Sequence, residues 1–467
     1  MTAGRSLDER YLEYCASAGA AFAAYPQLEP LRQYVFKELL VQQRADGWWQ
    51  HAKHWLRPLH RRARTRIRHR AEVLIWLESR REVVVDALVP VYRELVRRGV
   101  RVALVSDGGP PGVPPTAVPF RYTAEVLVPK WASRAWDALS ACEPALRGHS
   151  LRRSFLHACA MLQARLDELD RLLEAIGPDT VLGGSTQLLG GAALTVAARA
   201  HGTRSLLLQH GILQPFYTPL LADLMLTWGP SSADTLTALG VPPARLITTG
   251  SPRHDAMRPS DRDQARKGFV RALGLPDRPT FVFFSNGNDL VRNGMAPAEC
   301  ADWLDAVAAC YAHALNLVVR LHPNEDGSVY HRCSHLTVIR AIPKLGHTLD
   351  GCDWVGSLCS TVLYEGLLYG KPIWQFHADG WPALADNWKQ GLAFRVSSEA
   401  QLRDQTGTML AGGVERGVDG ALVARVFANH GRATQAVADV VASRLRPRAA
   451  RPRGSAIATE RRQHTGA

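Results

Sequence analysis

The chain has 467 residues, of which 46% are hydrophobic and 7% aromatic, a composition typical of a globular protein with two domains of ordinary size. It contains no run of about 18 apolar residues, and its charged start lacks the apolar segment of a signal peptide, so we expect a cytoplasmic protein without a membrane span. The eight cysteines are scattered without a C-x-x-C pair, which argues against a disulfide framework or a zinc site.

The net charge of +13 is concentrated in two segments. Residues 53–70 contain eight Lys or Arg and no acidic residue, and residues 444–467 contain seven Arg and one Glu. These segments account for the whole excess, so the rest of the chain is close to neutral. We therefore expect no nucleic-acid partner for the body of the protein.

Residues 1–70 are expected to form a helical, basic and peripheral extension. Within it, Trp48, Trp55 and Leu59 fall on one helical stripe among the basic side chains, and Pro58 would kink this helix. Such a stripe suits a helix that lies on an anionic membrane surface. It suits equally a helix that packs on the first domain and leaves its charges in solvent.

Residues 71–255 show strand patterns that alternate with helical patterns. The expected strands are 71–77, 100–106, 125–130, 178–186, 203–211, 221–229 and 244–250. The expected helices are 82–98, 131–145, 151–177, 187–201 and 231–240. This alternation predicts a parallel, wound sheet, and hence an N-terminal Rossmann-like domain over 71–255.

A polar stretch, 256–278, is expected to link this domain to a second one. A new alternating series then predicts a second Rossmann-like domain over 256–443, followed by a disordered basic tail at 444–467. The fold class is therefore α/β, with two Rossmann-like domains that face a cleft and a helical N-terminal extension. Ligands of such sheets bind outside the carboxyl ends of the strands, so residues at strand exits are the candidates for function.

Two motifs in the second half stand at such positions. Arg320, His322 and Pro323 follow one strand, where a ring N–H and a fixed positive charge could meet a phosphate. Ser360 and Thr361 open a helix two strands later, where hydroxyl and backbone N–H groups favour an anion. One turn further, Glu365 could bind ribose hydroxyls. The alternatives are a structural histidine that caps a loop and a plain helix cap with an exposed glutamate.

The pairing of H-P with S-T resembles the bacterial sialyltransferases of GT-B fold, whose H-P and S-S/T motifs hold the CMP part of the donor. It also resembles the capsule Kdo transferases and the CDP-glycerol glycerophosphotransferases. The first half contains Gln209-His210-Gly211, Ala222-Asp223, Trp228-Gly229 and 249–255 (TGSPRHD), similar to a Q-H-G…A-D…W-G…T-G-x-P-R-x-D series. That series is widespread in surface-carbohydrate transferases and epimerase-like GT-B proteins. The resemblance covers roughly residues 180–375.

The resemblance to the glycerophosphotransferases implies that His210 is the catalytic base. Imidazole is basic near neutral pH, and a glycine follows His210 and permits close approach of a substrate. The alternative is a hydrogen-bonded histidine that only positions a loop, and weaker candidates for the base are Asp107, Glu78 and Asp255. On the acceptor side of the cleft we expect Gln209, Gly211, Ser251, Arg253 and Asp255.

Several other chemistries lack their motifs. The segment 183–186 (GGST) is not a G-x-G-x-x-G, so no nicotinamide cofactor is expected, and no P-loop is present. The acidic D/E-D/E-G motif of the sialyltransferases precedes their H-P, whereas 325–327 (EDG) follows it here, so we treat that match as chance. No paired D-x-D stands at a strand exit, so we expect neither a metal nor a cofactor.

The sequence thus predicts a metal-independent glycosyltransferase of GT-B type. It would move a sugar from a CMP- or UDP-linked donor to a surface polysaccharide or a glycolipid, with the inner membrane as a surface on which it could act. A UDP-N-acetylglucosamine 2-epimerase-like enzyme and a noncatalytic scaffold of the same fold are the alternatives. The donor nucleotide should bind to the C-terminal domain and the glycan or lipid-linked acceptor to the N-terminal domain.

Overall fold

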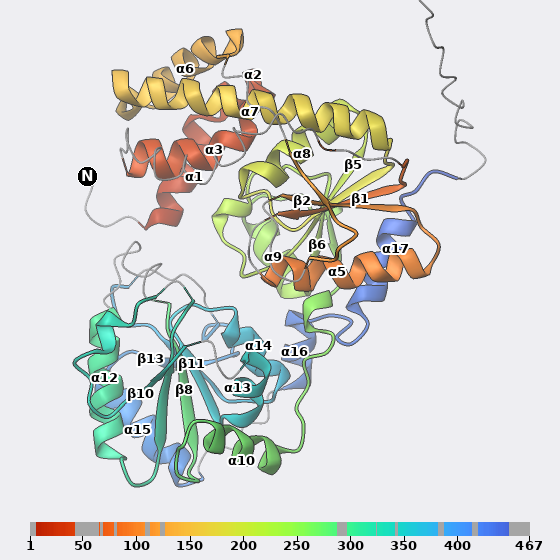
Figure 1. Cartoon of the computed structure of the whole chain (residues 1–467). Coiled ribbons are helices and arrows are strands. Elements are labelled where there is room, and N and C mark those ends of the chain that lie inside the picture. The colour runs from red at the N-terminus through yellow and green to blue at the C-terminus, as the bar shows by residue number, and fades with distance from the viewer. Residues whose placement is uncertain are drawn as a thin grey trace, which may run out of the picture.

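Two parallel β-sheets, each covered by helices on both faces, form the computed structural model of the chain (Figure 1). The structure describes residues 6–42, 65, 69–78, 82–107, 113–121, 127–286, 297–323, 325–340, 344–381, 387–412 and 419–447. The prediction of two Rossmann-like domains is confirmed.

The first sheet has seven strands in the order β3-β2-β1-β4-β5-β6-β7, and every neighbouring pair is parallel. The strands are β1 (Val73–Glu78), β2 (Val102–Asp107), β3 (Val118–Pro119), β4 (Thr180–Gly183), β5 (Arg204–Leu208), β6 (Leu224–Thr227) and β7 (Leu246–Thr248). This is the strand order of a Rossmann domain, in which the direction of winding reverses between β1 and β4. The predicted strand at 125–130 is wrong in its described part, because 127–129 is irregular.

The residues of β1 alternate between two hydrophobic cores. Leu74 and Trp76 pack in one core with α7 (His149–Ile176) and α8 (Leu189–Ala200), and α6 (Lys130–Cys142) and η3 (Pro144–Leu146) add to it. Val73, Ile75 and Leu77 face α5 (Glu82–Arg97) on the other side. All six residues of β1 are buried, as expected for a central strand of a parallel sheet.

The N-terminal segment forms α1 (Leu7–Ser17), α2 (Gly19–Ala24), η1 (Pro26–Leu31), α3 (Arg32–Tyr34) and η2 (Val35–Val41). Tyr11, Phe22 and Leu28 are fully buried in the same core as α7 and α8. The expected helical character is therefore present over 6–42, but this segment is a part of the N-terminal core and not peripheral. Its apolar residues recur every three to four positions, which gives each helix a buried face.

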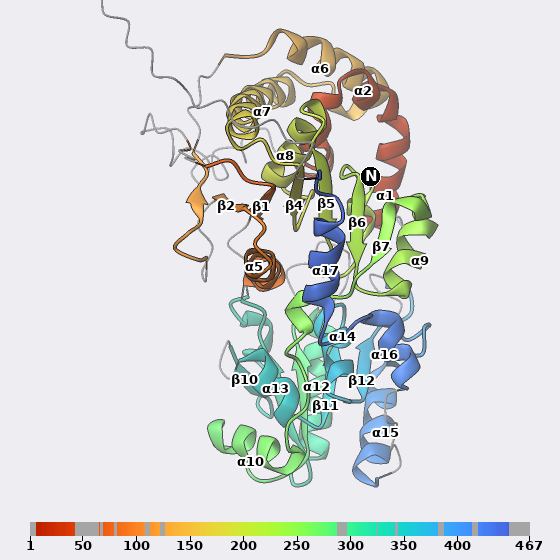
Figure 2. The same cartoon turned by 90° about the vertical axis from the view of Figure 1, so that its right-hand side faces the viewer.

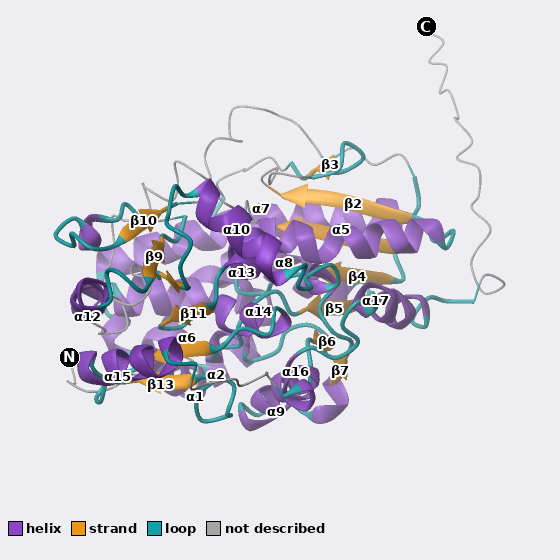
Figure 3. Ribbon diagram, turned by 90° about the horizontal axis from the view of Figure 1, so that it is seen from below, coloured by secondary structure: helices purple, strands orange, loops and turns teal. Residues whose placement is uncertain are grey.

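The second sheet repeats the topology, with the order β10-β9-β8-β11-β12-β13 and parallel neighbours throughout. Its strands are β8 (Thr280–Phe284), β9 (Asn316–Arg320), β10 (Thr337–Ile339), β11 (Trp354–Ser357), β12 (Ile373–Phe376) and β13 (Phe394–Val396). Phe281 and Phe283 face α12 (Pro297–Cys310) and α15 (Glu399–Leu410), whereas Val282 and Phe284 face the opposite core. Figure 3 shows the strands of both sheets between layers of helices.

The opposite core of the second domain includes α13 (Leu345–Gly351), α14 (Val362–Leu368) and α16 (Gly420–Val426). It also receives α10 (Arg262–Ala272), which lies inside the stretch that was expected to be a linker. The Asp261 side chain caps α10 by accepting from the Gln264 N–H, and Phe269 anchors the helix in the core. A single buried turn is enough to hold a helix whose remaining surface is polar.

The end of the described chain returns to the first domain, where α17 (Ala433–Ala442) lies against α5 (Figure 2). Val437, Ala438 and Val441 belong to the core beneath β1, so the predicted C-terminal span of 256–443 is wrong for this helix. The crossing is tight at Gly250, where φ is +89° and a Cβ would collide with the Ala428 carbonyl. Glycine at this position is therefore required by the crossing chain.

Within the described residues, no helix is both long and apolar enough to cross a membrane. The tryptophan and arginine stripe predicted around 48–67 lies outside the described residues, apart from Thr65. The basic tail beyond residue 447 also lies outside them.

Candidate functional site

The carboxyl ends of the strands in the N-terminal sheet carry the first set of candidate residues. Glu78 ends β1, Asp107 ends β2, and His210 follows β5 by two residues. Between β1 and β4, where the winding reverses, the chain leaves β4 through Gly183 and Gly184 before α8 begins. This is the position at which an open parallel sheet normally binds its ligand.

Glu78 occupies the first turn of α8. Its carboxyl group accepts the backbone N–H groups of Gly190, at 2.7 Å, and of Gly191, at 2.5 Å. A Cβ at Gly191 would collide with the Ser185 carbonyl and approach the Glu78 carboxyl group to 2.7 Å. The two glycines therefore let a side chain of the protein itself take the N–H groups that a phosphate would use in other Rossmann domains.

The environment of Glu78 makes its proton hard to lose. Burial and the neighbouring Asp107 raise the pKa of Glu78 to about 8, against the opposing effects of Arg165 and the two N–H groups. Asp107 itself forms an ion pair with the buried Arg165 of α7. Both carboxyl groups at this end of the sheet thus have internal partners, which weakens their candidacy as the base.

His210 is held by the neighbouring strand exit. Its Nδ1 lies 2.5 Å from the Gly184 carbonyl oxygen and 3.3 Å from the Tyr217 hydroxyl. Because a carbonyl only accepts, Nδ1 carries the proton, and Nε2 is the basic nitrogen of the neutral ring. The ring is half-buried, so this contact holds the imidazole in one orientation at the rim of the N-terminal sheet.

The residue before His210 fixes the strand exit on its other side. The Gln209 side chain accepts from the Trp228 backbone N–H at 2.9 Å and donates to the Gly211 carbonyl at 3.0 Å. The Trp228 indole N–H donates to the Gln209 carbonyl at 2.8 Å. Gln209 and Gly211, both expected on the acceptor side, therefore shape the loop that carries His210.

At the carboxyl ends of the strands in the C-terminal sheet, hydrogen bonds to Ser285 and Glu325 hold the turn that contains His322 and Pro323. The His322 backbone N–H donates to the Ser285 hydroxyl at 3.1 Å and to the Glu325 carboxylate at 3.2 Å, and Ser285 also donates to Glu325. Pro323 is exposed at the tip of the turn. Glu325 thus has a positioning role, although the sequence comparison had set it aside.

Asn286 connects the neighbouring strand exits at the point where the second sheet reverses its winding. Its side chain donates to the Cys359 carbonyl at 2.8 Å, one residue before Ser360. The Ser360 hydroxyl accepts from the Val362 N–H at 3.3 Å in the first turn of α14. The sequence did not single out Ser285 and Asn286, because polar residues commonly follow a strand. Their position between the ends of β9 and β11 follows only from the strand order.

Two other members of the predicted nucleotide set lie away from this rim. The Arg320 guanidinium donates to the Thr348 hydroxyl of α13, on the side of the sheet. Glu365 is 1% exposed, and its carboxylate binds Arg253 at 2.7 Å and His254 at 3.1 Å. Burial opposes the ionisation of Glu365, but Arg253 and His254 outweigh it and lower the pKa of this carboxyl group.

The segment 249–255 therefore forms a junction between the domains. Asp255 accepts the backbone N–H groups of Ala433 and Thr434, at 2.9 and 2.8 Å, and so caps α17. Ser251 is buried, and Arg253 holds Glu365 of the second domain. Ser251, Arg253 and Asp255, which were expected on the acceptor side, are committed to this junction.

A cavity of about 420 Å³ lies between the two domains. It is bordered by the loop after His210, by α9 (Pro230–Ala238) and by Tyr364 of α14.

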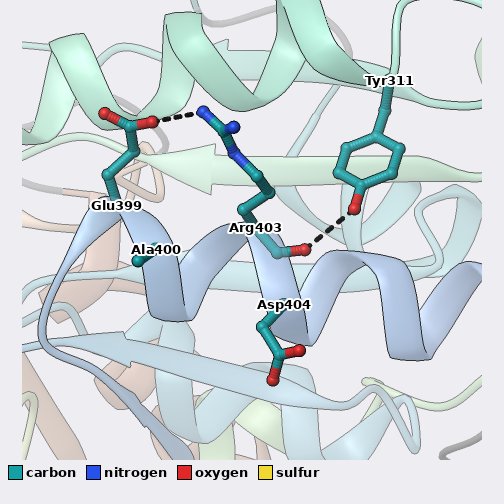
Figure 4. A pocket seen from close by; sticks show the side chains of 5 residues that line it. All are labelled: Tyr311, Glu399, Ala400, Arg403 and Asp404. Atoms are coloured by element: carbon teal, nitrogen blue, oxygen red, sulfur yellow. Dashed lines mark hydrogen bonds and ion pairs between the residues drawn. The ribbon is translucent and has the colours of Figure 1, made fainter.

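A second hollow, of about 620 Å³, lies against the outer helix α15. Figure 4 shows that Arg403 reaches back to Glu399 there, that the Tyr311 hydroxyl meets the Arg403 carbonyl, and that Asp404 points away. Glu399, Arg403 and Tyr311 thus bind one another, and we do not assign a function to that hollow.

Among the described residues, no group of three His, Cys, Asp or Glu side chains is placed to hold a metal ion.

No protein-family model and no curated protein sequence matches the chain. Solved structures do match over most of its length. The chain is similar to the UDP-GlcNAc 2-epimerase of Methanocaldococcus jannaschii in complex with UDP-GlcNAc and UDP, with 12% identity, coverage of 79% of this chain and 99% of that chain, and a TM-score of 0.51.

Two further matches are with proteins of other descriptions. The glycotransferase of kitacinnamycin has 17% identity, covers 81% of this chain and 100% of its own, and gives a TM-score of 0.49. An Anabaena protein in complex with UDP and glucose has 12% identity, covers 80% and 100%, and gives a TM-score of 0.49. At 12% identity and a TM-score of 0.51, the likeness to the Methanocaldococcus jannaschii structure concerns the fold, and the expected GT-B architecture is confirmed.

Proposed function

We propose that the protein is a glycosyltransferase that uses a nucleotide-sugar donor. The observation that carries this proposal is the setting of His210, whose Nδ1 faces the Gly184 carbonyl while the ring stays half-exposed at the rim of the N-terminal sheet. Glycosyl transfer requires a base that takes the proton of the acceptor hydroxyl as the new bond forms. A histidine fixed in one tautomer at a strand exit meets that requirement.

The donor would bind at the rim of the C-terminal sheet. Hydrogen bonds link the turn that carries His322 to the exit of β8, and the exit of β8 to the loop before Ser360. His322, Ser360 and Thr361 would then contact the phosphates of a CMP- or UDP-linked sugar. Arg320 and Glu365 would contribute only if their present partners, Thr348 and Arg253, were released.

The rival enzyme is a UDP-N-acetylglucosamine 2-epimerase-like protein, the description borne by a structural neighbour with a TM-score of 0.51. Our preference for transfer rests on His210. The Glu78 carboxyl group binds N–H groups of α8, and Asp107 forms an ion pair with Arg165. His210 is therefore the best-placed base of the three. A transferase releases nucleotide and glycosylates an added acceptor, whereas an epimerase changes the sugar nucleotide without any acceptor. Product analysis with and without acceptor therefore decides between them.

A noncatalytic scaffold is the third possibility. A thermal-shift screen over CMP, CDP, UDP and GDP tests it, because the proposed function requires stabilisation by at least one of these nucleotides. Absence of any shift, together with absence of nucleotide release, would remove both enzyme proposals. Metal independence belongs to the same proposal, and activity should survive EDTA.

The acceptor and the cellular site are further parts of the proposal. A surface polysaccharide or glycolipid acceptor would bring the enzyme to the cytoplasmic side of the inner membrane, where the basic segment 53–70 would meet anionic lipid. Neutralising the arginines of residues 61–70 should then release the protein from anionic vesicles. Deletion of residues 1–70 is not a suitable test, because 6–42 belongs to the N-terminal core.

A further inference from the structure

The cavity between the domains has a lining of a particular chemical kind. Apolar residues on its border include Leu213, Pro215 and Leu239. Residues with hydroxyl or amide side chains also border it: Gln209, Gln214, Ser231, Ser232, Thr235, Tyr364 and Gln390. None of the described residues that border the cavity carries a charge, although 21% of the whole chain is charged.

This lining favours one class of ligand. A phosphate or carboxylate would lose its hydration without gaining a cationic partner from the described lining, which is costly. An uncharged sugar ring instead presents hydroxyls that amides and hydroxyls such as those of Gln214, Ser232 and Tyr364 can bind. The volume, about 420 Å³, falls within the range of roughly 300–1,000 Å³ typical of small-molecule sites.

The place of the cavity in the fold indicates which substrate it would hold. Most of its border belongs to the N-terminal domain, from the loop 209–215 and from α9, and Gln209 is the residue directly before His210. Tyr364 reaches the cavity from α14, three residues after Thr361 of the proposed phosphate site. The border of the cavity therefore includes the residue before the proposed base and a residue of the helix that carries the proposed phosphate site, whereas His210 itself is not among the border residues.

We propose that this cavity binds an uncharged sugar unit of the acceptor. The assignment rests on the proposed glycosyltransferase function and goes beyond it, since it names the chemical class of the acceptor. The Trp228 side is rigid, because its indole and backbone N–H groups both bind Gln209. The α9 side is more open, because Thr235 and Ala238 are exposed.

Two threonines of α9 provide a matched pair of variants. Thr235 borders the cavity and Thr237 is not among its border residues, yet both are exposed. Each hydroxyl donates to a carbonyl four residues earlier, at 2.9 Å, so both variants lose the same local hydrogen bond. Thr235→Trp should fill the cavity, and Thr237→Trp should place the same indole outside it. Ala238→Trp is a second filling variant from an exposed site.

The test is ligand-observed NMR with methyl β-glucoside and N-acetylglucosamine as neutral probes and glucuronate as the charged probe, all with saturating UDP. We expect the neutral probes to bind the wild type and Thr237→Trp, and to bind Thr235→Trp and Ala238→Trp more than about tenfold more weakly. Glucuronate should not bind. UDP affinity should be the same in all four proteins.

Three results would overturn the assignment: no neutral probe binds the wild type, the filling variants bind it as well as the control, or glucuronate binds equally well. Failure of the proposed function has a different signature. In that case none of CMP, CDP, UDP and GDP would stabilise the wild type, and no nucleotide would be released from a donor. A normal UDP shift in the filling variants also shows that they are folded.

Discussion

The two domains share one strand order, yet the carboxyl ends of their sheets differ in how the first turn of the nearby helix is occupied. In the N-terminal domain, the buried Glu78 carboxyl group accepts two N–H groups of α8. In the C-terminal domain, the equivalent turn of α14 has the small Ser360 hydroxyl on the Val362 N–H, and the half-buried His322 follows β9, which β8 separates from β11. The first turn of α8 is therefore capped by a carboxyl group that accepts two N–H groups, and the first turn of α14 is capped by a single hydroxyl.

This difference suggests a division of labour. In the N-terminal domain the Glu78 carboxyl group already accepts the N–H groups of α8 that a phosphate would otherwise bind. We propose that His210, at the same rim, acts on a different substrate. A sheet whose rim offers a histidine and hydroxyls suits the charged part of a donor. We therefore propose that the two sheets bind different ligands despite their similar topology, because Glu78 already accepts the N–H groups of Gly190 and Gly191.

The largest expected effect is at the N-terminal rim. His210→Ala should lower kcat by about 10²–10⁴-fold with donor affinity nearly unchanged, because a general base acts in the chemical step. Steady-state kinetics together with a nucleotide titration measures both quantities. Tyr217→Phe is the matched control, because it removes a hydroxyl 3.3 Å from His210 Nδ1 but leaves the Gly184 contact. Near-normal turnover of His210→Ala would mean that the base is elsewhere.

The next effect belongs to the C-terminal rim. His322→Ala should weaken the binding of a pyrimidine nucleotide by more than about tenfold, since a hydrogen bond to a charged phosphate contributes roughly 1.5–3 kcal/mol. Calorimetric titration with UDP and CMP gives the affinity. His335→Ala serves as control, because this exposed histidine of the same domain pairs with Asp305. Unchanged affinity in the His322 variant would reject the phosphate assignment.

A smaller effect is a difference in stability between alanine variants at Gly191 and Gly183, two glycines of the N-terminal rim. Gly191→Ala should reduce the free energy of unfolding by about 1–3 kcal/mol, because the added Cβ collides with the Ser185 carbonyl. Gly183→Ala should be much milder, since a Cβ there meets nothing within 4 Å. Thermal unfolding of the two variants checks this difference. Equal stability of the two variants would show that the backbone can shift Gly191 away from the Ser185 carbonyl without loss.

The last effect concerns pH and is spread over several pH units. Burial and Asp107 raise the pKa of Glu78 to about 8, from the ordinary 4.5, so the native state binds this proton more tightly than the unfolded chain does. Stability contributed by the group should therefore fall as pH rises from about 4.5 to about 8, by at most about 1.4 kcal/mol per pH unit. Glu78→Gln should flatten this part of the stability profile, measured by urea unfolding. An unchanged slope would show that Glu78 ionises normally.

Local patterns in the sequence were sufficient for most strands and helices, because the two series of apolar strands are short, regular and separated by amphipathic helices. They failed for α10, whose surface is mostly polar and whose burial rests on Phe269 and Val270. They also failed for partners that are distant in sequence. Glu78 lies 112 residues from Gly190, and His254 lies 111 residues from Glu365. Such contacts depend on how the strands are ordered, which no local motif specifies.

The claim that the two rims differ in what they bind can be tested directly by hydrogen exchange with and without saturating UDP. We predict slower exchange in peptides that cover 320–323 and 357–365, and unchanged exchange in peptides that cover 183–191, where Glu78 already holds the N–H groups of α8. Protection at 183–191 with none at 320–323 and 357–365 would contradict the account, since the nucleotide would then bind at the rim that we consider closed.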